Sequence, residues 1–407
     1  MMNNIKKVPD VRVKGFYGEW EQEFLKDNVE FYSGLTYKPS DVCKKSSSSV
    51  LVIRSSNIKN GKFVFNNDDV YVKEEALNST ITDMNDIAVV VRNGSRPLIG
   101  KHGIVTKHLK KATVGAFMTG IRAYRFNFIN ILLDTNTFRK QVDENMGATI
   151  NQITNSTLNS MCFYFPNSNE QAQIGNFFKN LDEKLELEKE KLEKLINFKK
   201  AMLYDMFPKE GEKVPKVRFD CFDDEWEIFK IKKICEFFNG AGHENIVLEY
   251  GKYEIINSKF ISTEGKIKKY AMNQLVELKK DDIVFVMSDL PNGKALGKTY
   301  LITQDNKYTL NQRIGCYRVY DNKRILPNFI NMIVNRNPQY LFYDDGVNQT
   351  NLKKDEVLNI TLNIPSYSEQ LKIGNFFKNL DEKIELSEKK IVKIENFKKA
   401  MLDKMFV

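Results

Sequence analysis

The sequence predicts an α+β protein, with two mixed α/β domains separated by two long helices that pair as an antiparallel coiled coil. The main observation is a repeat, because the string IGNFFKNLDEK occurs at 174–184 and again, letter for letter, at 373–383. A second repeat opens each half, VPDVRVKGFYGEW at 8–20 and VPKVRFDCFDDEW at 214–226, and it holds both tryptophans of the chain. We therefore expect an internal tandem repeat with pseudo-twofold symmetry.

The order of the repeats predicts four segments. These are a first domain at 1–169, a first helix at 170–207, a second domain at 208–368 and a second helix at 369–407. The stretches between the repeated parts, 30–146 and 236–345, share few residues. Similar flanks around unlike centres predict one scaffold that presents two different working surfaces.

The repeated helical segments carry apolar residues at alternating intervals of four and three, which is typical of a coiled coil. No Pro or Gly interrupts the first segment between Asn176 and Phe207. Asn169 and Ser368 follow prolines that close apolar stretches, so we expect them to be the N-caps. The residues predicted to form the helix–helix seam are Ile174, Phe178, Leu181, Leu185, Leu192, Leu195, Ile373, Phe377, Leu380, Ile384, Ile391 and Ile394.

The predicted helices are long enough to act as a spacer. A helix of about 37 residues with a rise of about 1.5 Å per residue measures roughly 55 Å. At about 3.4 Å per base pair, this length corresponds to about one and a half turns of DNA. Such a spacer suits a reader of two separated half-sites. A plainer interpretation, in which the helices only form a stabilising core, stays open.

The composition indicates a basic protein without a disulfide scaffold. The chain has 62 Lys and Arg against 53 Asp and Glu, a net charge of +9, and most of the excess precedes residue 170. This balance favours an anionic partner, although a Lys-rich proteome gives the same bias. The five cysteines form no CxxC pair, which fits a reducing, cytoplasmic location. The apolar runs are too short for a membrane span, so we expect no membrane association.

The paired motifs resemble those of type I restriction–modification specificity subunits. The motifs are the VP.VR…F..EW opening of each half, the Pro-(x)₃-EQ..IG.FF..LDEK helix and the NFKKAML…MF ending. The resemblance covers essentially the whole chain. It implies that 1–169 and 208–368 are target recognition domains, each reading one half of a bipartite double-stranded DNA site. It also implies a non-catalytic chain that directs two methyltransferase (modification) subunits and restriction (translocase-nuclease) subunits, so any adenine methylation belongs to a partner.

In the first domain, the candidate DNA-reading residues follow an apolar strand. The stretch VVVRNGSRPLIGKHGIV at 89–105 runs from this strand into a polar tip that contains arginine, asparagine and glycine. Arginine can pair with guanine O6 and N7, and asparagine with adenine N6 and N7. An ordinary basic turn is the plain alternative. The candidates for DNA contact are Arg54, Asn57, Arg92, Asn93, Ser95, Arg96 and Lys101.

The second domain has a similar layout, VFVMSDLPNGKALGKTYLI at 284–302 followed by TLNQRIGCYRV at 309–319. Asp289 departs from a basic tip, and it either accepts a hydrogen bond from a cytosine amine or only shapes the turn. A solvated loop is the alternative for each residue. The candidates for DNA contact are Asn257, Ser258, Ser288, Asn292, Lys294, Lys298, Gln312 and Arg313.

Motifs for catalysis or cofactors are incomplete. GKALGKT at 293–299 is one residue short of a phosphate-binding loop, and NPQY at 337–340 lacks the second proline of an amino-methyltransferase NPPY motif. The three histidines show no paired ligand spacing, so we expect no metal and no cofactor. Two alternatives to the main interpretation remain. One is a specificity subunit whose partner fuses methyltransferase and nuclease, and the other is a coiled-coil scaffold that does not bind DNA.

Overall fold

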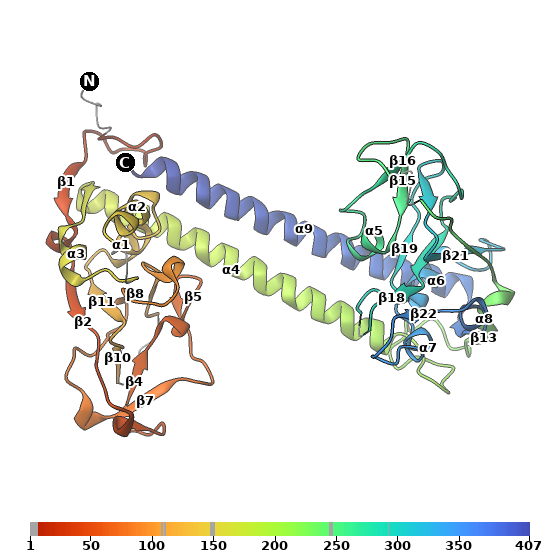
Figure 1. Ribbon diagram of the computed structural model, residues 1–407, viewed down its shortest axis with the longest axis horizontal. Helices are drawn as coiled ribbons and strands as arrows, with labels where there is room; N and C mark the ends of the chain where they lie inside the picture. Colours follow the sequence, from red (N-terminus) through yellow and green to blue (C-terminus); the bar gives the residue numbers. More distant parts are fainter. Residues whose placement is uncertain (1–6, 107–108, 110, 147–150, 244–246, 292) are drawn as a thin grey trace. The chain divides into compact units, whose positions relative to one another are not determined.

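The computed structural model describes residues 7–106, 109, 111–146, 151–243, 247–291 and 293–407. The chain forms two compact units: unit 1 comprises Met1–Lys191 and Ser387–Val407, and unit 2 comprises Leu192–Leu386. Both long helices, α4 (Ser168–Asp205) and α9 (Tyr367–Met405), therefore contribute residues to both units (Figure 1). The mixed α/β content and the two long helices confirm the predicted fold class, while the predicted four-segment boundaries stay a prediction.

In the part of unit 1 that the structure describes, the strands form three sheets, with the orders β1-β12, β10-β4-β7-β3 and β2-β11-β8-β9-β6-β5. Its inner strands are rich in β-branched residues, such as SVLVI in β4 and IAVV in β8, and are buried along their whole length. Its strands and short helices are β1 (Glu21–Phe24), β2 (Glu30–Ser33), β3 (Val42–Cys43), β4 (Ser49–Ile53), β5 (Ile58–Lys59), β6 (Lys62–Phe63), β7 (Val70–Lys73), β8 (Ile87–Val90), β9 (His102–Ile104), β10 (Ala112–Val114), β11 (Met118–Arg122), α1 (Phe126–Leu132), α2 (Asn136–Glu144), α3 (Asn155–Ser160) and β12 (Cys162–Phe165).

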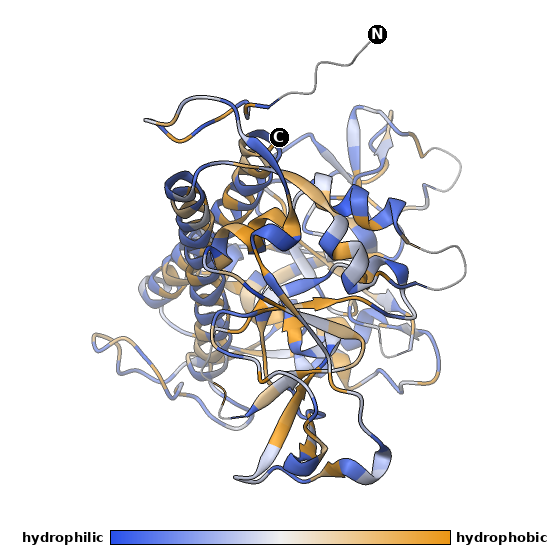
Figure 2. Ribbon diagram, turned by 90° about the vertical axis from the view of Figure 1, so that its left-hand side faces the viewer, coloured by the Kyte–Doolittle hydropathy of each residue, from blue (hydrophilic) through white to orange (hydrophobic). Residues whose placement is uncertain are grey.

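The described residues of unit 2 form four sheets, with the strand orders β13-β23, β14-β21-β17-β19, β16-β15-β20 and β18-β22. In Figure 2, which faces unit 1, strands of that unit are largely in the hydrophobic colour, while much of each long helix is hydrophilic. The strands and short helices of unit 2 are β13 (Glu227–Lys230), β14 (Cys235–Asn239), β15 (Tyr253–Ile256), α5 (Ser258–Ser262), β16 (Tyr270–Ala271), β17 (Ile283–Val286), β18 (Ser288–Asp289), β19 (Thr299–Leu301), β20 (Tyr308–Leu310), β21 (Ile314–Val319), α6 (Pro327–Val334), α7 (Pro338–Leu341), β22 (Thr350–Asn351), α8 (Lys354–Leu358) and β23 (Thr361–Ile364).

The unlike centres of the two halves have the same strand framework. In unit 1, β11 lies between β2 and β8, and β10 pairs in parallel with β4. In unit 2, β21 lies between β14 and β17, and β20 pairs in parallel with β15. The central strand pairings are therefore repeated in parts whose sequences differ, while the outer strands differ: β9 continues to β6 and β5 in unit 1, whereas β19 ends its sheet in unit 2.

An arginine repeated in both opening signatures pairs with a glutamate repeated at the start of both long helices. The Arg12 guanidinium donates two hydrogen bonds of 2.8 Å to the Glu170 carboxylate, and Arg218 makes the same pair with Glu369. The glutamates are nearly fully buried, so the paired arginine offsets the cost of removing the charge from water. This contact ties the start of each half to the beginning of its long helix.

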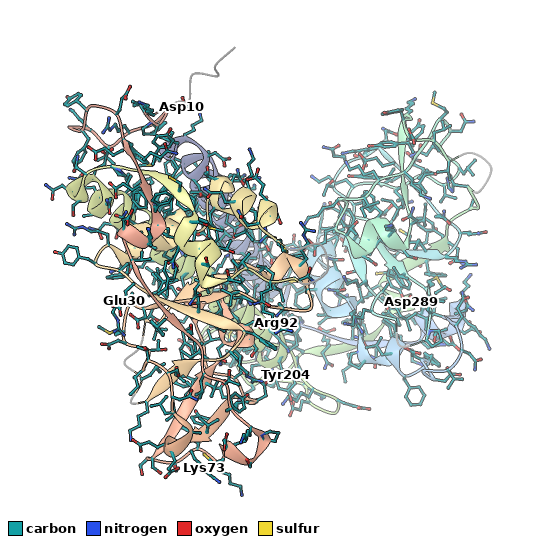
Figure 3. All side chains as sticks on the ribbon, turned by 60° about the vertical axis from the view of Figure 1, so that its left-hand side comes forward. Asp10, Glu30, Lys73, Arg92, Tyr204 and Asp289 are labelled. Carbon is teal, nitrogen blue, oxygen red and sulfur yellow. The ribbon has the colours of Figure 1, made fainter. Side chains whose placement is uncertain are left out.

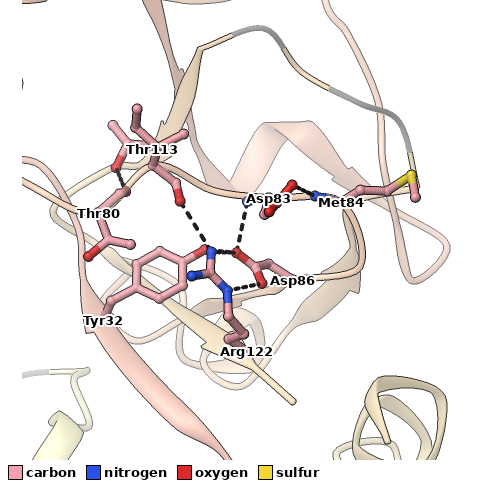
Figure 4. A network of polar contacts seen from close by, with 8 residues as sticks. Tyr32, Thr80, Asp83, Met84, Asp86, Thr113 and Arg122 are labelled. Atoms are coloured by element: carbon pink, nitrogen blue, oxygen red, sulfur yellow. Dashed lines mark hydrogen bonds and ion pairs between the residues drawn. The ribbon is translucent and has the colours of Figure 1, made fainter. Parts of the chain in front are cut away.

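A second ion pair is repeated between neighbouring strands in each of the two units. Arg122 of β11 donates to both carboxylate oxygens of Asp86, at 3.0 and 2.8 Å, and the phenol of Tyr32 donates to the same carboxylate at 2.8 Å (Figure 4). In unit 2, Arg318 donates to both oxygens of Asp282 at 2.8 and 2.7 Å. In both units the pair joins β11 or β21 to the residue just before β8 or β17.

Segments of the long helices run antiparallel within each unit. In unit 1, Lys398 pairs with Asp182 at 2.6 Å, and Lys189 pairs with Glu395 at 2.7 Å. In unit 2, Lys199 pairs with Asp381, which repeats the Lys398–Asp182 pair. Aromatic pairs repeat in the same way, because Phe177–Phe397 and Phe198–Phe376 both meet at 6.2 Å between ring centroids.

The predicted seam residues are buried or half-buried in these segments. Ile174, Phe178, Ile373 and Phe377 are almost fully buried in the cores of their units. The caps differ from the prediction, because the side chains of Asn167 and Ser366, not Asn169 and Ser368, accept hydrogen bonds from the first turns of the helices. The helices begin at Ser168 and Tyr367, two residues earlier than that prediction required, because the chain turns soon after each proline.

Both tryptophans are core residues. The exposed fraction is 3% for Trp20 and 1% for Trp226, so neither indole offers a surface to a partner. The five cysteines are free thiols. Within the described ranges, no helix combines the length and apolar character needed to cross a membrane.

Candidate nucleic-acid interface

The tip that follows β8 in unit 1 is held by two other segments. The N–H groups of Val91 and Arg92 donate to the carbonyl oxygen of Phe117, at 3.0 and 3.1 Å. The N–H of Asn93 donates to the carbonyl oxygen of Asn151 at 3.2 Å, and Arg92 forms an isolated bridge with Gln152. The residues 91–98, 115–117 and 151–153 therefore form one surface, which we call tip 1.

Arg92 and Phe117 project from tip 1 together. The Arg92 guanidinium carbon lies 5.2 Å from the centroid of the Phe117 ring, and both side chains are exposed (Figure 3, in which Arg92 is labelled). A guanidinium over an aromatic face makes a cation–π contact, which limits the orientations of the arginine. Arg92 can thus present its donors to an external acceptor.

Asn93, Ser95 and Arg96 have internal contacts in tip 1. The side-chain oxygen of Asn93 accepts from the N–H of Ser95 at 2.9 Å, which forms an Asx turn. The Asn151 side chain donates to the carbonyl oxygen of Gly94 at 3.0 Å. Arg96 is exposed and lies 3.9 Å from Asp143. Asn93 therefore shapes the turn, whereas Ser95 and Arg96 lie on its outer surface.

Arg54, Asn57 and Lys101 lie beside the short helix at 55–57. Asn57 is fully buried, and its amide donates to Asp69 at 2.6 Å and to the carbonyl oxygen of Val64 at 3.1 Å. Arg54 pairs with Asp68 at 3.0 Å. Asn57 thus folds the loop from inside, and we do not include it among the proposed DNA contacts.

Lys101 connects this loop to tip 1. Its ammonium donates to the carbonyl oxygen of Ser55 at 2.9 Å. Partial burial, together with the nearby charge of Lys59, lowers the pKa of Lys101. Lys101 follows Gly100, whose φ of +82° suits glycine better than other residues.

His102 is buried behind tip 1 among acceptor oxygens. Its Nδ1 lies 2.9 Å from the carbonyl oxygen of Gly100, and its Nε2 lies 3.0 Å from that of Asn130 and 3.4 Å from the Asp134 carboxylate. Burial acts to lower the pKa of His102, but the hydrogen bond and charge of Asp134 and the two carbonyl groups raise it overall. Since both ring nitrogens face acceptors, the imidazolium fits this site.

Tip 2, which follows β17 in unit 2, has the same construction. The N–H of Met287 donates to the carbonyl oxygen of Arg313 at 3.2 Å, and Ser288 pairs with Asn351 across β18 and β22. The amide of Gln349 donates to the Ser288 hydroxyl at 2.8 Å. We define tip 2 as residues 287–291, 293–297, 311–313 and 349–352.

Asp289 shapes tip 2. Its carboxylate accepts hydrogen bonds from the N–H groups of Leu290, Ala295 and Leu296, at 2.9, 2.7 and 3.0 Å (Asp289 is labelled in Figure 3). Three such bonds use most of the roughly four acceptor positions of a carboxylate and hold Asp289 against its own turn. Of the two roles considered for this residue, the structure supports the shaping of the turn.

The remaining candidates of unit 2 lie around this tip. Lys294, Gln312 and Arg313 are exposed, whereas Lys298 donates to the carbonyl oxygen of Ser262 at 3.3 Å. The side chain of Asn257 caps α5 by accepting from the N–H of Phe260, and Ser258 is the first residue of that helix. Asn292 lies outside the described residues.

Hydrogen bonds and strand register align the two tips residue by residue. The N–H of Val91 donates to the carbonyl oxygen of Phe117, and that of Met287 to the carbonyl oxygen of Arg313, so Val91 corresponds to Met287. Lys101 corresponds to Lys298, because the carbonyl oxygen of each accepts from the last residue of β8 or β17. It follows that Arg92 corresponds to Ser288 and that Phe117 corresponds to Arg313. Each tip thus has one arginine at this pair of positions. In tip 1 it follows β8, and in tip 2 it precedes β21.

Several residues of the tips were missed by sequence reasoning. Phe117 showed one signal, an aromatic residue in a short turn between two apolar strands. The positions of Asn151, Gln152, Gln349 and Asn351 depend on segments far along the chain, and their sequences gave no signal. The DNA contacts of all the candidate residues stay predictions. Among the residues with described positions, no group of three His, Cys, Asp or Glu side chains could hold a metal ion.

Comparisons with known proteins agree with the repeated architecture. The chain resembles a type I restriction–modification S subunit from M. genitalium with a TM-score of 0.60 and 17% identity, over 98% of this chain and 99% of that one. It also resembles a chain from a structure on the complex assembly and conformational transition of the type I R-M system, with a TM-score of 0.55 and 13% identity, over 95% and 97% of the two chains. At these identities the likeness concerns the fold.

The family comparison assigns each repeat separately. The model described as "Type I restriction modification DNA specificity domain" matches residues 17–197 and again residues 223–396. Together the two matches cover most of the chain, and each includes one of the tips described above. The chain therefore belongs to the family of type I restriction–modification DNA specificity proteins.

Proposed function

We propose that the chain reads a bipartite DNA sequence, with tip 1 contacting one half-site and tip 2 the other. The observation that carries this proposal is the pairing of one repeated framework with different exposed residues in the two tips. A common framework would approach each half-site in the same way, while different side chains would select different bases. Exposed lysines and arginines around the tips would add phosphate contacts that do not depend on the sequence.

We further propose that the chain has no catalytic role and directs partner subunits to the DNA. Apolar side chains are exposed at equivalent places in the two long helices, namely Leu187 and Leu386, and Phe198 and Phe397. Equivalent apolar surfaces offer two similar docking sites, which suits two methyltransferase subunits. Methyl transfer and DNA cleavage would then belong to the methyltransferase and restriction subunits.

Methylome sequencing tests this function. The chain would be expressed with the methyltransferase encoded beside it, in a host that lacks both, and native DNA would be sequenced for modified bases. The expected result is a split motif of two short words around a gap of fixed length. A stable complex with the methyltransferase that gives no new methylation at any motif would contradict the proposal and favour a scaffold without DNA binding.

A further inference from the structure

Arg92 and Phe117 form an exposed stacked pair whose backbone positions are both fixed. The N–H of Arg92 donates to the carbonyl oxygen of Phe117, and the guanidinium lies over the ring of the same residue at 5.2 Å. On its other side, Arg92 bridges to Gln152. The backbone of Arg92 is therefore held by two segments, and its guanidinium is held by the Phe117 ring.

This arrangement prepares the guanidinium for a planar ligand. An arginine on a surface loop ordinarily loses rotamer freedom when it binds, which weakens the complex. Contact with an exposed aromatic face favours one range of orientations before a ligand arrives. The exposed fraction of Phe117 is 57%, so more than half of this large apolar side chain faces water. Its burial therefore adds little to the stability of unit 1.

The chemistry of the pair selects guanine among the bases. In the major groove, only guanine presents two acceptors side by side, O6 and N7, and these match the two parallel donors of a guanidinium. Lysine supplies the same charge as arginine, but its ammonium lacks the planar pair of parallel donors that the Phe117 ring orients. A phosphate would accept the same donors, but it would not discriminate between sequences.

Unit 2 has the same pair of positions, but its arginine is on the other segment, the one that precedes β21. Ser288 occupies the place of Arg92, and Arg313, which is exposed, occupies the place of Phe117. Each unit thus offers one guanidinium at this surface, from opposite strands.

We propose that Arg92, positioned by Phe117, reads a guanine in the half-site of unit 1, and that Arg313 reads a guanine in the half-site of unit 2. This inference rests on the proposed function and names the bases and residues through which it would act. Phe117 is a positioning residue in this account, because it acts through Arg92.

The test uses the full chain in complex with its methyltransferase. Once the wild-type split motif is known, duplexes are made in which each guanine of the motif is replaced in turn by 7-deazaguanine, which lacks the N7 acceptor. The affinities of the wild-type complex and of the Arg92→Met and Arg313→Met complexes are measured on each duplex. Lys140→Met, which removes an exposed basic side chain from α2, serves as the matched control.

We expect one 7-deazaguanine position in one word to weaken binding of the wild-type and Lys140→Met complexes by about 10- to 100-fold. The same position should have no effect on the Arg92→Met complex, which has no donor for N7. Arg313→Met should remove the effect of one position in the other word. Phe117→Ala should reduce the discrimination by about 2- to 5-fold, and Phe117→Tyr should restore it, since tyrosine keeps the aromatic face.

The outcomes separate the inference from the proposed function. If the wild-type complex reads a split motif but Arg92→Met responds to every 7-deazaguanine as the wild type does, the inference is wrong and the function stands. The inference is also wrong if Arg92→Met and Arg313→Met affect the same word. If the wild-type complex reads no split motif, the proposed function itself fails.

Discussion

The ring of Phe406 meets the indole of Trp20 edge-on, with 6.2 Å between the ring centroids and an interplanar angle of 90°. Phe207 meets Trp226 at 6.0 Å and the same angle. Phe406 follows the end of α9, and Phe207 follows the end of α4. The last turn of one repeat's helix therefore completes the core that the other repeat's opening signature begins.

Phe406→Ala should destabilise unit 1 by about 3 kcal/mol, because Phe406 also packs against Phe128 and Phe178. Hydrogen exchange, followed by mass spectrometry on the full chain, measures the loss of protection for each segment. The loss should be concentrated in β1, β12 and α1. Phe207→Ala is the matched variant for unit 2, and equal losses of protection in both units from either variant would contradict this assignment.

Arg122→Met should destabilise unit 1 by about 3 kcal/mol near neutral pH, because it leaves the Asp86 carboxylate buried without its cation. Arg318→Met should cost more in unit 2. Asp86 keeps a hydrogen bond from Tyr32, whereas Phe238 lies at the corresponding place in unit 2 and has no donor. Urea unfolding, monitored by exchange within each unit, compares the two variants, and a larger cost for Arg122→Met would show that Tyr32 does not stabilise the carboxylate.

The free energy of unfolding of unit 1 should fall as the pH rises above about 6.5. The folded-state pKa of His102 is raised above the ordinary histidine value of 6.5, so the stabilisation is fully present below that value and is lost as the pH rises through the folded pKa. At the acid end, the pKa of Asp134 is lowered: burial alone would raise it, but the hydrogen bond and charge of His102 prevail. The stabilisation from Asp134 is therefore lost as the pH falls through that folded pKa, below 3.8.

His102→Thr provides the control for this pH dependence. Thr299 occupies the corresponding place in unit 2, where its hydroxyl donates to the carbonyl oxygen of Asn331. The difference in unfolding free energy between the wild type and His102→Thr should shrink between pH 6 and pH 8. A difference that stays constant over this range would mean that the pKa of His102 is the same in the folded and unfolded protein, and a difference that grows would mean that His102 is held neutral in the folded protein.

Asp289→Ala should weaken recognition by tip 2 without affecting tip 1. The substitution removes the acceptor of three N–H groups and loosens the turn, with a cost of about 1–3 kcal/mol for unsatisfied groups. In a methylome, the word read by unit 2 should become less strict while the other word keeps its sequence. If both words remain strict, Asp289 does not determine the geometry of the tip.

The sequence predicted the parts of the fold whose residues are repeated. The long helices, their antiparallel pairing and the signature residues follow from letters that occur twice, and the structure shows that Arg12 and Glu170 are repeated because they pair. Asp86 and Arg122 recur at the same spacing as Asp282 and Arg318, 36 residues, so this pair was also visible in the sequence but was missed. The common strand framework was not visible, because buried strands tolerate many exchanges among apolar residues.

The positions of the tips could be predicted from the sequence, but the roles of their individual residues could not. Strand, polar turn and strand identify a loop, but whether an asparagine folds the loop or faces outward depends on distant segments. Asn57 became a buried turn residue because Val64 and Asp69 lie beside it, and Phe117 became part of tip 1 because β10 and β11 bring it beside β8. Periodicity carries no information about such contacts.

The central claim is that each unit reads its own half of the target. The most direct measurement is hydrogen exchange on the complex of the chain with its methyltransferase, bound at saturation to duplexes in which one word of the motif is scrambled. We predict that scrambling one word removes the protection of 91–98 and 115–117 and leaves that of 293–297 and 311–313, and that scrambling the other word does the reverse. Equal loss of protection in both tips with either scrambled duplex, at full occupancy, would contradict the account.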